Sequence, residues 1–257
     1  MHSTHRMCES IAQSHPFGAI VQIEKGGEYA VVQLGRLDVP TADRIMAGLV
    51  AERHADRIPD LLLFLSYAPC LAYGARQLDE SDLLRSYFVE QGIPIYQTIR
   101  GGGLTYHWPG QLICYPLLKL LPHEQNIPAY MHNLEQIGLE VLTTVGLRAH
   151  RRRRTAAHIG LWIGNDKIAS MGIRIARWVT SYGFALNLSG DVSPARYIKP
   201  CGLPVKLTTV QERTGVSPDP QVTMASVQLF FEKYFRRRVG HFAAEIQHRI
   251  DAKLIQP

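Results

Sequence analysis

The chain has 257 residues, 46% of them hydrophobic, and a formal net charge of +6 at pH 7. This length suits one large domain or two small ones, and the hydrophobic content is ordinary for a protein with a buried core. The longest strongly apolar run, LLLFL at 61–65, is far shorter than the roughly 20 residues that span a bilayer, so no transmembrane helix is expected.

Residues 1–16 contain no apolar signal core, and they include Glu9, which argues against a transit peptide. We therefore expect a flexible N-terminus and a cytoplasmic protein, with a mitochondrial location as the alternative. The four cysteines, at positions 8, 70, 114 and 201, form no CxxC pair and lack the Cys/His spacing of zinc sites. In a reducing compartment they are expected to be free thiols.

The first part of the chain alternates between strand and helix patterns. The segment YAVVQLG at 29–35 has strand composition. It is followed by a predicted helix over 41–57, in which Thr41 is positioned to act as the cap. The run LLLFLSY at 61–67 fits a buried strand.

A second helix is predicted over ESDLLRSYFVEQG, residues 80–92, with Gly92 as its stop. Apolar residues recur at helical spacing in this segment. They form one predicted face, made of Leu83, Leu84, Tyr87 and Phe88.

The segment RGGGLTYHWPGQLICYP at 100–116 is the most unusual in the chain, and predicted strands at 93–99 and 111–118 flank it. Consecutive glycines are costly to order, because glycine loses more backbone freedom on folding than any other residue. We therefore expect the backbone of this loop to approach something closely. The loop matches neither a P-loop nor a GxGxxG fingerprint, so it predicts no ATP or dinucleotide site.

The remainder of the chain again mixes the two kinds of element. Helices are predicted over 129–146 and 222–238, and strands over 159–164, 167–175 and 183–189, the first two of these strands joined at Asn165 and Asp166. Because strands and helices follow one another without βαβ regularity, the predicted fold class is α+β, with mixed or antiparallel sheets flanked by helices.

Basic residues are concentrated in RAHRRRR at 148–154 and RRR at 236–238. One interpretation is a solvated loop and a helix C-terminus, where cations suit the helix dipole. The other is a docking patch for an acidic macromolecule. No aromatic residues are interleaved with the arginines as in nucleic-acid motifs, so a protein partner is favoured over nucleic acid.

Cys201 is the best candidate for a nucleophile among the cysteines, because YIKPCGLP places it between prolines and a glycine in a loop. Cys70 and Cys114 lie in apolar runs, where cysteine usually acts as a small hydrophobe. A reactive thiolate needs a neighbouring cation. Lys167, His107, Lys199 and the arginine run are candidates for this role, although Lys167 at a strand end could equally reach for water.

Four segments, in this order, resemble the octanoyltransferases of lipoate biosynthesis, also called lipoate-protein ligase B. The resemblance runs from about Tyr29 to Gly215, and so predicts a single catalytic domain over 1–257 with a C-terminal helical segment at about 221–250. The segments are RGGGLTYHWPGQLICYP at 100–116, GLWIGNDKIASMGIRI at 160–175, GFALNL at 183–188 and IKPCG at 198–202.

The resemblance implies the α+β fold of biotin and lipoate protein ligases and an acyl-transfer reaction. An octanoyl group would pass from octanoyl-acyl carrier protein, through a thioester on Cys201, to a lysine of a lipoyl domain, with Lys167 paired to the cysteine. Neither a metal nor ATP nor another cofactor is implied, because the donor thioester is already activated. The implied substrate-binding residues are Arg100, Gly101, Gly102, Gly103, Leu104, Thr105, Tyr106, His107, Ser170, Met171, Gly172, Gly183, Phe184 and Ala185.

The acceptors implied by the resemblance are the lipoyl domains of 2-oxoacid dehydrogenase complexes and the glycine cleavage H protein. Such acceptors and acyl carrier proteins are typically acidic, which suits a basic enzyme, and no nucleic acid or membrane is implied as a partner. By the same resemblance we expect a monomer.

This sequence departs from the family pattern at three positions. Trp108 stands where relatives have glycine, and Tyr67 and Tyr182 align with histidines. An indole in place of a hydrogen atom adds a large apolar body beside the loop. It could shorten the acyl pocket, cover it or point away from it.

Two alternatives to the transferase remain at this stage. One is an ATP-dependent lipoate or biotin-type ligase of the same fold, in which Cys201 has no obvious task. The other is a non-catalytic protein that binds acyl carriers or lipoyl domains, disabled by Trp108 or Tyr67.

Overall fold

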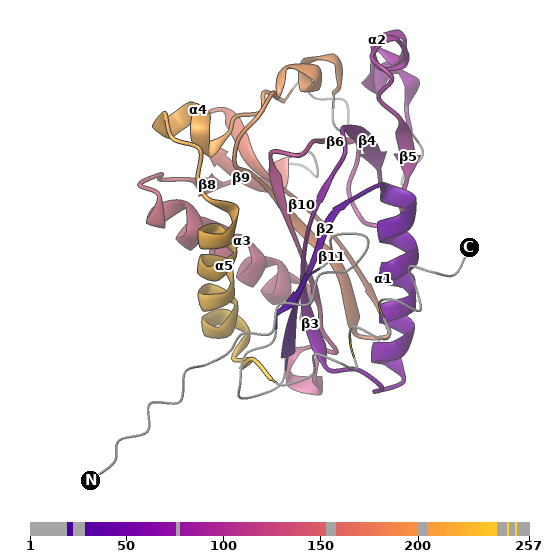
Figure 1. The fold of residues 1–257 in the computed structure, drawn as a ribbon, viewed down its shortest axis with the longest axis vertical. Helices are drawn as coiled ribbons and strands as arrows, with labels where there is room; N and C mark the ends of the chain where they lie inside the picture. Colours follow the sequence, from indigo (N-terminus) through magenta and orange to yellow (C-terminus); the bar gives the residue numbers. More distant parts are fainter. Residues whose placement is uncertain are drawn as a thin grey trace.

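The computed structural model describes residues 20–22, 29–75, 78–152, 158–199, 205–240, 246 and 250. A large mixed sheet runs through the molecule, and a smaller sheet lies at one end of it (Figure 1). In spatial order, the large sheet consists of β1 (Ile20–Gln22), β2 (Tyr29–Leu37), β3 (Asp60–Tyr67), β7 (Gln111–Leu117), β11 (Val179–Asn187), β10 (Asp166–Ala176), β9 (Gly160–Ile163) and β8 (His150–Arg151).

The strand pairing in the large sheet is antiparallel except between β2 and β3, which run parallel. The parallel pair is connected by helix α1 (Val39–His54), which crosses over one face of the sheet. Alternating residues of β3 separate the two sides, because Leu63 and Leu65 pack toward α1 whereas Leu62 and Phe64 pack toward the opposite face. This confirms the predicted α+β class.

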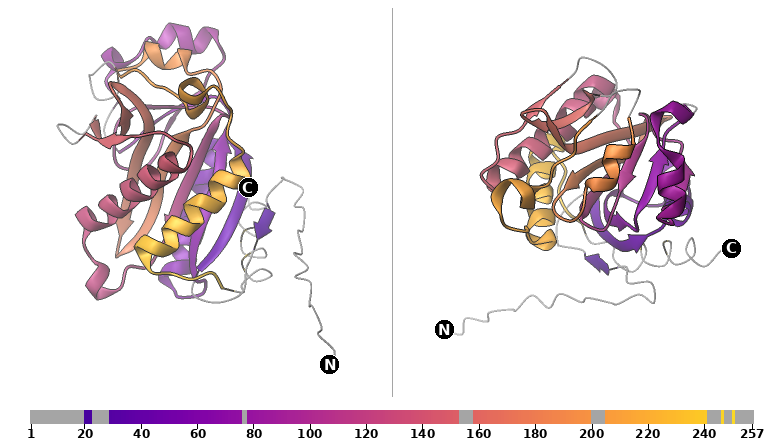
Figure 2. Two further views of the ribbon diagram at one scale, coloured as in Figure 1. Left: turned by 90° about the vertical axis from the view of Figure 1, so that its left-hand side faces the viewer. Right: turned by 90° about the horizontal axis from the view of Figure 1, so that it is seen from above.

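Helices α3 (Ile127–Thr144) and α5 (Pro220–Phe235) cover the other face of the sheet and pack against each other (Figure 2). Each long helix begins at an acidic or amide cap whose side chain accepts a backbone N–H, and a proline follows within two residues. The caps are Asp38 for α1, Asn126 for α3 and Asp219 for α5. The prediction of Thr41 as the cap of α1 was wrong, because Thr41 supplies the N–H that Asp38 accepts.

The predicted helix over 80–92 was also only partly right. The chain forms a 3-10 turn at Glu80–Asp82 and a short helix α2 (Arg85–Glu90), and Leu83 between them is extended. Leu83 bridges Ile198, and this pairing interrupts the helix. Leu84, predicted to lie on the apolar face, is therefore exposed, whereas Gly92 ends the helix with a φ of 62° as predicted.

The smaller sheet contains β5 (Ile95–Gln97), β4 (Cys70–Tyr73) and β6 (Thr105–His107) in that order. Strand β6 was not predicted, because its three residues lie between glycines and a Trp-Pro pair, which are typical of a loop. A third hydrophobic cluster joins this sheet to α2 and to the segments around a 3-10 turn at Ser193–Tyr197 and around Val205. A short helix α4 (Val210–Thr214) follows.

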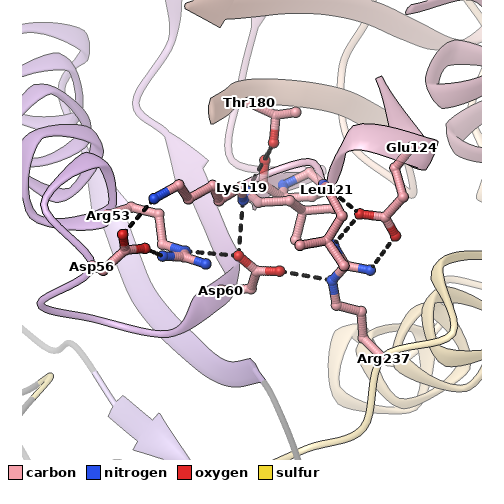
Figure 3. A network of polar contacts seen from close by, with 10 residues as sticks. Arg53, Asp56, Asp60, Lys119, Leu121, Glu124, Thr180 and Arg237 are labelled. Atoms are coloured by element: carbon pink, nitrogen blue, oxygen red, sulfur yellow. Dashed lines mark hydrogen bonds and ion pairs between the residues drawn. The ribbon is translucent and has the colours of Figure 1, made fainter. Parts of the chain in front are cut away.

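A buried ion-pair network ties the elements together at the start of β3 (Figure 3). The Asp60 carboxylate lies 2.8 Å from Nε of Arg53 and 2.7 Å from Nε of Arg237, and it accepts the backbone N–H of Lys119. Arg237 also pairs with Glu124 at 2.6 Å. Arg237 belongs to the RRR run, so at least this arginine stabilises the fold and is not part of a solvated docking patch.

Among the described residues, no helix combines the length and apolarity needed to cross a membrane.

Candidate active site

The glycine-rich loop and β6 meet the paired strands β10 and β11 at one small cavity. Its free volume is about 20 Å³, which is room for a single water molecule. Apart from Tyr115, every residue that lines it belongs to the implied substrate-binding set. The lining residues are Arg100, Thr105, His107, Tyr115, Ser170, Met171, Gly172, Gly183, Phe184 and Ala185.

The glycine-rich loop lies against strand β10, which is the close approach that its composition predicted. The Gly101 N–H donates to the Ile173 carbonyl at 2.8 Å. A Cβ on Gly172 would lie only 2.9 Å from the Gly101 carbonyl oxygen, so a side chain there would push the loop away. Gly102 has a φ of 90°, a conformation that L-residues rarely adopt. The glycines therefore allow the loop to pack closely against the strand.

Arg100 stabilises the conformation of this loop through hydrogen bonds to its backbone. Its guanidinium donates to the carbonyls of Gly101 and Gly103 at 3.1 Å and of Ala72 at 2.7 Å, and to the Thr105 hydroxyl. The side chain is buried, and burial lowers the pKa of its guanidinium. Arg100 thus places a buried positive charge at the cavity, and it donates hydrogen bonds to its own loop, to strand β4 and to Thr105.

His107, at the end of β6, is buried and contacts both polar and aromatic groups. Its Nδ1 lies 2.8 Å from the Gln111 side-chain oxygen, and its ring packs edge-on against Tyr67 with centroids 5.2 Å apart. Burial, with the nearby Arg100 charge as a second cause, lowers the His107 pKa from 6.5 to about 4. The imidazole is therefore neutral near pH 7.

Tyrosines form the wall behind the cavity. The Tyr67 and Tyr115 hydroxyls lie 3.3 Å apart, and the Tyr115 ring packs edge-on against Tyr182. The Tyr182 hydroxyl donates to Asp43 of α1 at 3.0 Å. Tyr182 has a φ of 58°, which is unusual for a bulky residue within a strand. Its side chain packs on the face of the sheet that α1 covers, whereas its strand partner Ile173 packs on the opposite face.

Trp108 points away from the cavity. Its ring stacks on Tyr106 with centroids 5.4 Å apart, and its indole N–H donates to the Ser189 carbonyl at 2.7 Å. Together with Leu104 and Tyr106, it belongs to the third hydrophobic cluster, and none of the three lines the cavity. Leu104 and Tyr106 of the implied set thus pack in this hydrophobic cluster and do not face the cavity.

Lys167 is the second residue of strand β10, three residues before Ser170 of the cavity wall. It is buried, and its Nζ lies 5.5 Å from the centroid of the Trp162 ring. Its backbone N–H donates to Lys206 and its carbonyl accepts from Thr208, so the segment after Val205 pairs with it. Lys167 does not line the cavity.

Cys201 and Cys8 lie outside the described residues. The chain is described up to Lys199, whose N–H donates to the Asp82 carbonyl, and again from Val205. Cys70 and Cys114 are buried as predicted, and burial raises the pKa of the Cys70 thiol to about 12 and that of Cys114 well above its usual value. Both are therefore neutral thiols and poor nucleophiles.

Two arginines of the run at 148–154, Arg151 and Arg152, contact other parts of the protein, whereas Arg148 is exposed. Arg151 pairs with Glu135 at 2.9 Å, and Arg152 lies over the Trp162 ring, 4.7 Å from its centroid. Arg153 and Arg154 lie outside the described residues.

Sequence reasoning missed three polar residues around the cavity: Gln111, Tyr115 and Asn187. The signal was present in the strand patterns. Gln111 and Asn187 are polar ends of apolar strands and lie opposite each other in the β7–β11 pairing. Tyr115 lies two residues from both Ile113 and Leu117, so its side chain is on the same face of the strand as theirs. Nothing in the sequence indicates that its hydroxyl meets Tyr67.

Known proteins resemble this chain over most of its length. The family model for the lipoyl protein ligase A/B catalytic domain matches residues 41–236. An octanoyltransferase from Solibacter usitatus is 40% identical over 179 residues, which cover 69% of this chain and 80% of that protein. An octanoyltransferase from Gloeobacter violaceus is 37% identical over 211 residues, covering 79% and 91% of the two chains.

Solved structures show the same fold at low sequence identity. A lipoate-protein ligase A bound with ATP is 14% identical, with a TM-score of 0.71 over 89% of this chain and 94% of that one. A bi-partite lipoate protein ligase from Thermoplasma acidophilum is 15% identical, with a TM-score of 0.64 over 90% and 92%. The chain therefore belongs to the lipoyl protein ligase A/B catalytic-domain family and, within it, to the octanoyltransferases, which are acyltransferases.

Proposed function

We propose that this enzyme transfers an octanoyl group from octanoyl-acyl carrier protein to a lysine of a lipoyl domain, through a thioester on Cys201. This would be the first step of endogenous lipoate biosynthesis. The observation that carries the proposal is the convergence of the 100–107, 170–172 and 183–185 segments on one cavity. These are the segments for which the family resemblance implies substrate binding.

In the proposed first half-reaction, the Cys201 thiolate attacks the carbonyl carbon of the donor thioester. The new carbon–sulfur bond forms as the bond to the carrier sulfur breaks, and the carrier leaves as a thiol after taking the proton of the Lys167 ammonium, which becomes a neutral amine. Lys167, as an ammonium, stabilises the Cys201 thiolate. The pairing of Lys167 with Lys206 and Thr208 supports this role, because that segment follows Cys201 by only a few residues.

In the second half-reaction, the ε-amine of the acceptor lysine attacks the Cys201 thioester and an amide forms as the carbon–sulfur bond breaks. Neutral Lys167 takes the proton that the amine loses. Backbone N–H groups near Gly172 or Cys201 hold the oxyanion.

In the proposed binding mode the acyl tail enters this cavity. Because an eight-carbon chain needs far more room than the free volume of about 20 Å³, this mode requires side chains to move. Met171 and Phe184 line the cavity and belong to the core beneath it. Methionine adapts its shape easily, and each buried methylene of the acyl chain contributes roughly 0.8 kcal/mol to binding. Burial of the acyl tail would therefore offset the free-energy cost of moving Met171 and Phe184 toward the core.

Mass spectrometry of a lipoyl domain tests the reaction. Incubation with the enzyme and octanoyl-acyl carrier protein, without ATP, should add one octanoyl group to the domain, and Cys201→Ala should abolish this gain. If the domain is instead modified only when ATP and free octanoate are supplied, undiminished by Cys201→Ala, the protein is a ligase. Binding of the carrier without any modification in either mixture would show a non-catalytic protein.

A further inference from the structure

A continuous chain of buried side-chain contacts connects His107 to the backbone of Lys167. His107 Nδ1 lies 2.8 Å from Gln111 Oε1, and Gln111 Nε2 lies 2.9 Å from Asn187 Oδ1. Asn187 Nδ2 then lies 2.9 Å from the Thr208 carbonyl and 3.3 Å from the Lys167 carbonyl. Each of these five residues is at least nine-tenths buried.

The direction of every hydrogen bond in this chain follows from its far end. Backbone carbonyls only accept, so Asn187 must turn its NH₂ toward Lys167 and Thr208 and its oxygen toward Gln111. Gln111 must therefore donate to that oxygen, and its NH₂ also faces the Tyr106 carbonyl at 3.4 Å. Its own oxygen is left facing His107, and two facing acceptors would repel, so His107 Nδ1 must carry the proton.

We propose that the chain formed by Gln111 and Asn187 holds His107 as the Nδ1–H tautomer, so that Nε2 is a hydrogen-bond acceptor at the reaction cavity. In this scheme Gln111 and Asn187 are positioning residues. The identity of the group that His107 accepts from rests on the proposed function: it is an N–H of the attacking acceptor amine.

The surroundings of His107 keep it neutral, as the proposal requires. Arg100 on the glycine-rich loop contributes a positive charge, and Tyr67 of β3 and Tyr115 of β7 contribute phenols rather than carboxylates. Cys70 of β4, paired with His107 in the small sheet, is a neutral thiol. With burial as the main cause and Arg100 as the second, the His107 pKa is about 4.

This tautomer separates two roles that histidine can play in acyl transfer. With a proton on Nε2, His107 would donate to the oxyanion of the tetrahedral intermediate. With a lone pair on Nε2, it cannot stabilise an oxyanion, but it can orient the attacking amine through one of its N–H bonds. The oxyanion is then left to backbone N–H groups, and His107 aligns the nucleophile.

Nuclear magnetic resonance of enzyme labelled with ¹⁵N-histidine tests the tautomer without any substrate. Long-range ¹H–¹⁵N correlations distinguish the two ring nitrogens, and the signals missing from His107→Gln identify those of His107. The expected result is a neutral Nδ1–H ring throughout pH 5–8. A neutral Nε2–H ring, or an imidazolium near pH 7, would overturn the proposal whether or not the enzyme transfers octanoate.

Gln111→Met then tests the positioning role. This change removes the acceptor for Nδ1–H at nearly constant volume, so both tautomers should appear and kcat/KM should fall by about 10- to 100-fold, as for one hydrogen bond lost in the transition state. Gln125→Met is the matched control, because the Gln125 amide also donates to a backbone carbonyl, that of Leu120, but lies in another part of the fold. Unchanged His107 signals in Gln111→Met would contradict the proposal. If that variant does not fold, the wild-type spectrum still decides the tautomer.

Discussion

Trp108 replaces a glycine of the family pattern, and its side chain serves the fold rather than the cavity. The indole N–H bond to Ser189 fixes the turn that follows β11, and the ring fills space beside Tyr106. Trp108→Ala should lower the free energy of unfolding by about 3–5 kcal/mol, measured in urea, while the preference for acyl length stays unchanged. A shifted acyl preference in the folded variant would mean that Trp108 shapes the pocket after all.

Met171 is the adaptable side chain in the cavity wall. Met171→Ala should open space toward the core and favour a longer acyl chain, because added methylenes find an apolar environment there. Differences of one or two methylenes are worth about 1–3 kcal/mol, so we expect the decanoyl-to-octanoyl ratio of kcat/KM to rise about tenfold or more. Competition between the two acyl carriers, read by mass spectrometry, measures this ratio. An unchanged ratio would place the acyl tail elsewhere.

At the scale of elements, the ion pairs around Asp60 connect α1, β3, the chain after β7 and the chain after α5 (Figure 3). Removing one member leaves buried charges without compensation, which typically costs about 3–5 kcal/mol. Arg237→Met should therefore be strongly destabilising in urea unfolding. Lys233→Met is the control, because the Lys233–Glu140 pair lies at the surface, with 56% and 28% of the two side chains exposed, and should contribute at most about 1 kcal/mol. Equal effects of the two substitutions would contradict this ranking.

The same network lies far from the cavity. Asp60 begins β3 and Tyr67 ends it, so seven residue steps, roughly 23 Å of strand, separate the ion pairs from the ring that packs on His107. We therefore expect Arg237→Met to retain the specific activity of the folded fraction.

The elements that the sequence predicted well are those with a long periodic pattern or a continuous apolar run. Strand β3 and helices α3 and α5 appear within a few residues of their predicted limits. The 80–92 segment failed because Leu83 pairs with Ile198, more than one hundred residues away, and no local pattern contains that contact. The small strand β6 was missed because its three residues are too few to show alternation.

The cavity could be predicted only through the resemblance, because the spacing of residues says nothing about which loops meet. Arg100 illustrates the limit, since the sequence places a charge beside glycines but not its four contacts with its own loop and strand β4. Tyr182 illustrates it further, because strand alternation would put its ring on the wrong face. The role of Cys201 remains a prediction.

At the scale of the whole molecule, His107 makes stability depend on pH. Its pKa is about 4 in the folded protein against 6.5 for the free side chain. Between these values the unfolded chain takes up a proton that the folded protein does not, so stability falls as the pH decreases from 6.5 toward 4. The loss attributable to His107 is at most about 3 kcal/mol. Urea unfolding of His107→Gln should show a correspondingly shallower decline over this range, and an identical decline would refute the buried neutral histidine.

The central claim is that the octanoyl group rests covalently on Cys201 during transfer. Intact-mass measurement of the enzyme mixed with octanoyl-acyl carrier protein alone, before any acceptor is added, tests it most directly. The account predicts the mass gain of one octanoyl group, located at Cys201, absent in Cys201→Ala and discharged when a lipoyl domain is added. A lipoyl domain that becomes octanoylated while the enzyme never carries the group, or an enzyme that carries it in Cys201→Ala, would contradict the account.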